Sequence, residues 1–344
     1  MAKFALWWIR WNEDLRTYES RMKVGGRKAT VNDFQERGFD RVVVLDGEGR
    51  NSHCSGSLYS NGYNDGRELA EWILTRDIDM PLYITIPFYR PDGKQRDQTQ
   101  ASFSSVPDSY YRGWIDGVLS VDVNKMMGFY WSYESSLQTG PHGENVSKEF
   151  IQGLYSYVHG YGQELIWIPS TGGGTSDRGV SYLNDPNYDG ILNIGGYFDY
   201  IFVQPNYYQY QKLDEKGNPG LPYTYEKLVE KIRWVHEELP RDINNPNTTI
   251  SIEMEVDRTV LGIHCTYPSA CPEGMNCDSN IYTCYEHCRE HQSQKAINYA
   301  LDYVRALNDA GWKPSDLAYY FSTDFKVIDI LQEKCWRELN EPYV

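Results

Sequence analysis

Acidic side chains stand at the ends of two apolar segments, where they could transfer protons or attack a substrate. In residues 249–257 every second side chain is apolar, and the intervening polar set includes Glu253 and Glu255. Residues 126–134 alternate in the same way and finish on Glu134. Because successive side chains of a strand point to opposite faces, the apolar set faces a helix layer and these glutamates face the other side.

Two carboxyl groups facing each other are the requirement for hydrolysing a glycosidic bond. One carboxyl protonates the leaving oxygen while the other attacks the anomeric carbon or activates water. We therefore predict a glycoside hydrolase that acts on a neutral oligo- or polysaccharide, with Glu134 and Glu255 as catalytic residues. Glu253 lies one layer deeper and is the alternative to Glu255. In a purely structural interpretation, Arg10 and Arg258 would pair with these carboxylates.

The elements that must position these residues follow a regular pattern. Eight apolar or alternating runs recur about every forty residues, and helix-like segments separate them. This alternation predicts α/β architecture and a single (β/α)₈ barrel over residues 1–344. A doubly wound open sheet usually has fewer strands. The predicted strands are Phe4–Trp11, Arg41–Asp46, Leu82–Tyr89, Met126–Glu134, Glu164–Ser170, Tyr200–Tyr207, Thr249–Asp257 and Leu317–Thr323.

Further polar groups and aromatic rings fall near the carboxyl ends of these strands, where barrel enzymes build their sites. Polar groups can bind sugar hydroxyls, and flat rings can cover the apolar faces of pyranoses. A non-catalytic carbohydrate-binding barrel of a cell-surface assembly would use the same set and is the alternative function. The predicted substrate-binding residues are Trp8, Arg10, Asp46, Tyr89, Trp131, Trp167, Gln204, Asn206, Tyr207, Tyr208 and Asp324.

Composition narrows the choice of partner. The chain has 33 basic and 48 acidic residues, a formal net charge of −15. This charge argues against nucleic acid and anionic membranes as partners, because both are bound through Lys and Arg. No apolar stretch is long enough to span a membrane. Aromatic residues make up 15% of the chain, including 29 Tyr, which suits a carbohydrate partner.

Cysteine usage bears on the compartment. Cys265, Cys271, Cys277, Cys284 and Cys288 lie close together after the seventh predicted strand. This density indicates a disulfide-bonded, cysteine-rich loop, and with it either an oxidising compartment or a thermophile that keeps disulfides inside the cell. We expect an extracellular or cell-surface location, with any leader absent from this chain. Zinc binding is the weaker interpretation, because the spacings lack paired CxxC knuckles. The odd cysteine could pair with either Cys54 or Cys335, and the sequence leaves both possible.

Motifs for other chemistry are missing. There is no dinucleotide-binding GxGxxG after the first strand, no GxSxG elbow, and no lysine after Gly172–Gly174 to form a phosphate loop. His287 and His291 lack the glutamate of HExxH. We therefore expect neither a cofactor nor a metal. A divalent metal held by Asp46, Glu134 and Glu255 is the remaining enzymatic alternative.

Glutamates at the ends of the fourth and seventh strands resemble those of the retaining barrel glycosidases of clan A. The resemblance implies that Glu134 is the general acid/base and Glu255 the nucleophile. That clan usually has Asn directly before the strand-four acid, whereas Tyr133 stands here. A second resemblance is more specific. Residues 128–134, 198–208 and 253–255 are similar to segments of a little-characterised barrel domain family of unknown function, which is found in bacterial surface proteins and archaea.

Overall fold

Eight parallel strands form a closed barrel in the computed structural model, which describes residues 2–46, 53–76, 78–88, 98–139, 145–171, 190–210, 223–262 and 286–344. The strands follow one another around the barrel in chain order, and the last pairs with the first through the register Ala2 to Asp316. The predicted (β/α)₈ architecture is confirmed. In barrel order the strands are β1 (Ala2–Asn12), β5 (Arg41–Asp46), β6 (Leu82–Ile86), β7 (Met126–Trp131), β8 (Glu164–Trp167), β9 (Tyr200–Val203), β10 (Thr249–Glu255) and β11 (Asp316–Tyr320).

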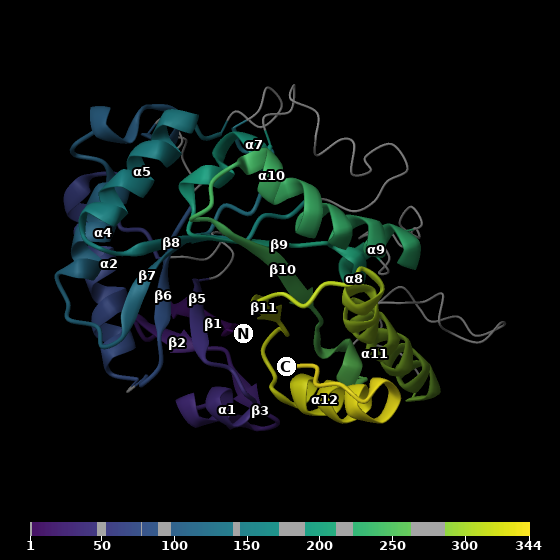
Figure 1. Cartoon of the computed structure of the whole chain (residues 1–344). Coiled ribbons are helices and arrows are strands. Elements are labelled where there is room, and N and C mark those ends of the chain that lie inside the picture. The colour runs from purple at the N-terminus through teal and green to yellow at the C-terminus, as the bar shows by residue number, and fades with distance from the viewer. Residues whose placement is uncertain are drawn as a thin grey trace.

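Helices surround the barrel (Figure 1) and bury the outward-facing strand residues in one large apolar layer. The principal helices are α2 (Tyr59–Leu74), α4 (Tyr110–Leu119), α5 (Lys148–Gly160), α9 (Tyr225–Arg233), α11 (Glu286–Asp309) and α12 (Lys326–Leu339). Shorter ones are α1 (Val31–Glu36), α7 (Ile191–Ile194), α8 (Tyr207–Tyr210) and α10 (Leu239–Ile243). The small strands β2 (Thr17–Ser20), β3 (Lys23–Val24) and β4 (Arg27–Lys28) complete the N-terminal part.

The barrel interior is filled up to the level of the site. Its side chains form a separate apolar cluster that includes Phe4, Leu6 and Leu45. Near the amino ends of the strands, the Arg41 guanidinium donates to the hydroxyls of Tyr83 and Tyr200, both at 3.0 Å. These layers fill the barrel near the amino ends of the strands, and barrel enzymes bind their ligands at the opposite, carboxyl ends.

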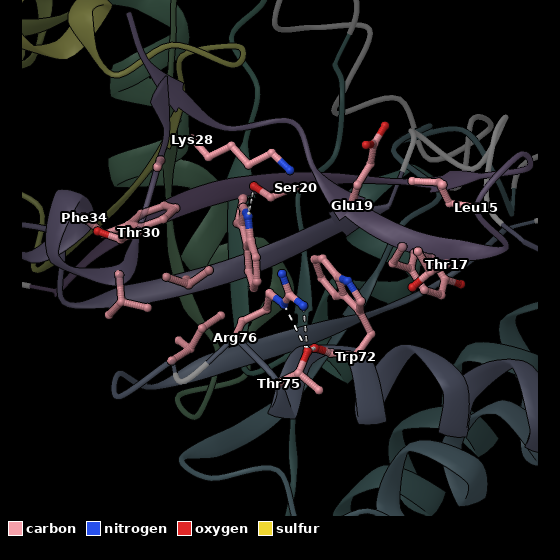
Figure 2. A pocket seen from close by; sticks show the side chains of 16 residues that line it. Leu15, Thr17, Glu19, Ser20, Lys28, Thr30, Phe34, Trp72, Thr75 and Arg76 are labelled. Atoms are coloured by element: carbon pink, nitrogen blue, oxygen red, sulfur yellow. Dashed lines mark hydrogen bonds between the residues drawn. The ribbon is translucent and has the colours of Figure 1, made fainter. Parts of the chain in front are cut away.

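The flank beside β1 is covered differently from the rest of the barrel. The chain between β1 and β5 contains β2, which pairs antiparallel with the end of β1, and only the six-residue helix α1. A cavity of about 480 Å³ lies here, bounded by Trp7, Trp72 and Phe34. Figure 2 shows Arg76 beside Trp72 and Lys28 reaching over from the opposite side. This cavity contains none of the predicted catalytic glutamates.

Candidate active site

All three predicted glutamates line one cavity of about 310 Å³ at the carboxyl ends of the barrel strands. Glu255 is the last residue of β10, and Glu253 lies two residues earlier on the same face. Glu134 follows β7 by three residues, so the strand is shorter than the sequence predicted. The lining residues are Leu6, Leu45, Glu134, Ser170, Gln204, Asn206, Gln209, Glu253, Glu255 and Tyr320.

Glu255 is held from two directions, although only 2% of its surface is exposed. The hydroxyl of Tyr303, on α11, donates to Glu255 Oε2. The amide of Asn206 donates to Glu255 Oε1 at 3.4 Å. The Ser170 hydroxyl in turn donates to Asn206 Oδ1 at 3.0 Å, which fixes the orientation of that amide. A buried carboxylate with such donors remains ionised more readily than one without them.

Glu134 sits on an extension of the barrel wall and is more accessible than Glu255. Its Oε1 accepts a hydrogen bond of 3.3 Å from the hydroxyl of Tyr130 on β7. Its backbone carbonyl accepts from the Ser170 amide at 2.6 Å, and a bridge between Ser135 and Ser170 continues the pairing of β7 with β8. The side chain is half-buried, a suitable position for a group that exchanges protons with solvent.

Arg10 does not pair with Glu253. Its side chain is 54% exposed and forms a salt bridge with Glu19 on β2, because the antiparallel β1–β2 pairing sets the two residues side by side. The structural interpretation that joined Arg10 to the glutamates is therefore wrong, and Arg10 is not among the residues that line the cavity.

The predicted tryptophans Trp131 and Trp167 lie in the apolar layer between strands and helices, fully buried. Their indole N–H groups nevertheless act near the site. Trp167 donates to the Tyr133 carbonyl at 2.8 Å, and Trp131 donates to Gln138 Oε1 at 2.8 Å. Both bonds hold the segment that carries Glu134. The structure thus gives these rings a supporting position and does not place them as sugar platforms.

Of the other predicted binding residues, Gln204 and Asn206 line the cavity. Trp8 contacts the lining residue Tyr320, and Asp46 is fully buried at the end of β5, but neither is itself a lining residue. Outside the cavity lining lie Tyr207, which donates to Asp302, Tyr208, which donates to Asp257, and Asp324, which accepts from the Gly25 and Lys326 amides. Tyr89 falls outside the described residues.

Sequence reasoning missed several residues that complete the site. Ser170, Gln209 and Tyr320 line the cavity, and the alternation of the fifth and eighth strands could have indicated the first and last of them. Tyr303 reaches Glu255 from an outer helix. Lys231, on α9, is also buried nearby, and burial lowers its pKa to about 8 while the charge of Glu255 opposes this shift. Nothing in the local sequence pattern distinguishes these two helix residues from core and surface positions.

Within the described ranges, no three His, Cys, Asp or Glu side chains form a group that could hold a metal ion. Asp46, Glu134 and Glu255, the residues of the metal alternative, all lie within these ranges. The cysteine-rich loop around 265–284 and the side chain of Cys288 lie outside the described residues. Cys335 is a buried thiol of α12 that forms no disulfide bond. Among the described residues, no helix is both long and apolar enough to cross a membrane.

Comparison with known proteins finds one relative by sequence. No protein-family model matches the chain. An uncharacterized protein of Methanocaldococcus jannaschii is 27% identical over 373 aligned residues, which cover 95% of this chain and 90% of that protein.

Several solved structures resemble the chain weakly. A GH18 chitinase from Pseudoalteromonas aurantia has 12% identity and a TM-score of 0.45, covering 93% of this chain and 94% of that one. An endo-1,4-beta-D-mannanase from Thermotoga petrophila has 11% identity and a TM-score of 0.43, covering 85% and 83%. The barrel assignment rests on the strand order of this chain.

Proposed function

We propose that the protein is a glycoside hydrolase that cleaves glycosidic bonds in a neutral oligo- or polysaccharide. The observation that supports the proposal is the shared cavity of Glu134 and Glu255, which come from different strands and differ in environment. Glu134 is half-buried beside a tyrosine hydroxyl, whereas Glu255 accepts two hydrogen bonds in a buried position. Two carboxyls in unlike surroundings are suited to an acid role and a nucleophile role.

In this mechanism Glu134 protonates the leaving oxygen while the Glu255 carboxylate attacks the anomeric carbon. Glu134 then takes a proton from water, and the water oxygen displaces Glu255 with net retention of configuration. The amides of Gln204, Asn206 and Gln209 lie in the same cavity and can bind sugar hydroxyls. Following the appearance of the first anomer by NMR tests retention, and an inverted product would exclude the covalent step.

The test is release of reducing ends from a panel of neutral glycans. We expect Glu134→Gln and Glu255→Gln each to lower turnover by about 10³-fold or more with folding intact, since each removes a group essential to one step. Glu149→Gln is the matched control, because Glu149 is exposed in the first turn of α5. Inactive Glu253→Gln together with active Glu255→Gln would transfer the nucleophile role to Glu253.

Binding of a glycan without any cleavage by the wild type would contradict the proposal and support a carbohydrate-binding barrel. Tyr320 is the one aromatic ring among the described lining residues, which gives a stacking platform less support than a reaction site. A cell-surface or extracellular location forms part of the proposal and is tested by fractionating the native source.

A further inference from the structure

A lysine occupies a position on α9 that an apolar residue would normally hold. Lys231 is 4% exposed and shares the inward face of the helix with Leu228 and Ile232. Burying an ammonium group is costly unless hydrogen bonds and an opposite charge compensate it. The surroundings of Lys231 contain both.

The Lys231 ammonium connects the ends of two barrel strands. It donates to Thr171 Oγ1 at 3.1 Å, just beyond β8, and to the Pro205 carbonyl at 3.3 Å, just beyond β9. Thr171 also donates to the Gln204 carbonyl at 2.8 Å, which joins the same two strand ends. A single side chain therefore holds both segments from the helix side.

These strand ends carry the residues that orient Glu255. Ser170 precedes Thr171, and Asn206 follows Pro205, so each contact of Lys231 lies one residue from a member of the hydrogen-bonded chain Ser170–Asn206–Glu255. A shift of either strand end would change the distance from the Asn206 amide to Glu255.

Charge links Lys231 to Glu255 as well. Burial is the main influence on the pKa of Lys231, and the Glu255 carboxylate is the charge that opposes it. Tyr223, whose ring lies 5.2 Å from the ammonium, and Tyr303 on α11 both have pKa values raised by burial and by Glu255, so they stay neutral. Glu230, the neighbouring residue on α9, is exposed, and its charge also raises the pKa of Tyr223.

We propose that Lys231 is a positioning residue whose buried ammonium keeps Glu255 ionised and holds the ends of β8 and β9 in the arrangement that orients it. The inference rests on the proposed function only in taking Glu255 as the nucleophile. As the pH rises past about 8, Lys231 loses its proton and its hydrogen bonds to the ends of β8 and β9 weaken, so the site becomes less competent on the alkaline side.

The test reads Glu255 directly, without any assay of activity. Protein labelled with ¹³C at the glutamate carboxyls is titrated by NMR, and Glu255→Gln identifies the Glu255 signal. In Lys231→Met we expect the midpoint of Glu255 to rise by about one pH unit or more, because a nearby positive charge has been removed. Lys227→Met, on the outer part of the same helix, should leave the midpoint where it is.

The wild type provides a second readout that needs no variant. The Glu255 signal should move again near pH 8, as Lys231 loses its proton. An unchanged midpoint in Lys231→Met, or the absence of this second movement in the wild type, would overturn the proposal. If the wild type hydrolyses a glycan, its alkaline limb near pH 8 should shift upward in Lys231→Arg, because guanidinium stays charged. A wild type inactive on every glycan would contradict the proposed function while the NMR result still decides the role of Lys231.

Discussion

The hydroxyl of Tyr303 on the outer helix α11 donates a hydrogen bond to Glu255 Oε2 inside the barrel mouth. The same hydroxyl accepts the backbone N–H of Tyr208 at 3.2 Å. This second bond directs the phenolic proton toward Glu255, and the pKa of Tyr303 is raised well above its usual value by burial and by Glu255. A tyrosine outside the barrel wall is thus a fixed donor to the proposed nucleophile.

Removal of this donor should reduce turnover without weakening substrate binding. We expect Tyr303→Phe to lower kcat by about 10- to 100-fold, since a hydrogen bond to a charged group contributes about 1.5–3 kcal/mol. KM should change little, because Tyr303 does not line the cavity. Steady-state kinetics on a cleaved glycan measures both. Tyr299→Phe, one turn earlier on α11, is the control, and an equal loss there would point to a general effect of disturbing the helix.

Asn206 has a left-handed backbone conformation with φ of 58°. Asparagine tolerates this region better than most residues, and glycine tolerates it fully. We expect Asn206→Gly and Asn206→Ala to lose activity alike, because both lack the amide that contacts Glu255. Only the alanine variant should also lose about 1 kcal/mol of unfolding free energy relative to the glycine variant. Urea denaturation separates the two effects, and equal stabilities would argue against backbone strain at this position.

The alternation of apolar and polar residues was enough to predict the barrel and the three glutamates that line its cavity. The two-residue alternation identifies which strand residues face inward. Inward-facing carboxylates near the carboxyl end of a strand therefore lie at the mouth of the barrel. The exact strand ends were not predictable from it. Glu134 follows β7 by three residues because the segment after Trp131 is held by side-chain hydrogen bonds and the Ser135–Ser170 bridge.

The alternation of apolar and polar residues does not predict contacts between segments that are distant in the sequence. Trp131 and Trp167 are of the residue type that stacks on sugars, but they lie on the strand faces that pack against the helix layer. The sequence pattern offers Arg10 as a partner of the barrel glutamates, whereas the unpredicted strand β2 supplies Glu19 directly beside it. Tyr303 and Lys231 reach the site from helices, and helical periodicity predicts burial without indicating which strand end lies beneath.

Acid sensitivity of folding should depend on Asp33 in α1. Its carboxylate accepts two bonds from the Arg27 guanidinium and one from the Thr30 amide at 2.7 Å. These bonds, with that of Arg27 the largest influence, hold the pKa of Asp33 well below its usual range. A lowered carboxyl pKa stabilises the fold above the unfolded-state value of about 4, and this contribution is lost as the pH falls toward the folded-state value.

Asp33→Asn should therefore flatten the dependence of unfolding free energy on pH below about 4, by at most about 1.4 kcal/mol per pH unit. The measurement is urea unfolding of wild type and variant at successive pH values. Asp14→Asn is the control, because Asp14 is an exposed carboxyl in the turn after β1. Parallel curves for wild type and Asp33→Asn would mean that the Arg27 contact does not persist in solution.

The packing of α2 against α4 depends on glycines that bring the two backbones into contact. A Cβ added at Gly66 would lie 2.3 Å from the carbonyl oxygen of Trp114, and one at Gly113 would lie 2.0 Å from that of Tyr59. Helix propensity alone favours alanine over glycine by about 1 kcal/mol. Steric overlap with a backbone atom outweighs this gain, because neither helix can move without disturbing the layer that covers β6.

We therefore expect Gly66→Ala to lower the unfolding free energy by about 1–3 kcal/mol. Gly160→Ala is the control, because Gly160 ends α5 and no atom lies within 4 Å of the added Cβ. The unfolding free energy of this variant should equal that of the wild type or rise slightly. Because the α2–α4 contact lies outside the barrel wall, Gly66→Ala should keep the wild-type KM at temperatures where it remains folded. A stabilised Gly66→Ala variant would show that the two helices are farther apart in solution than their glycines allow.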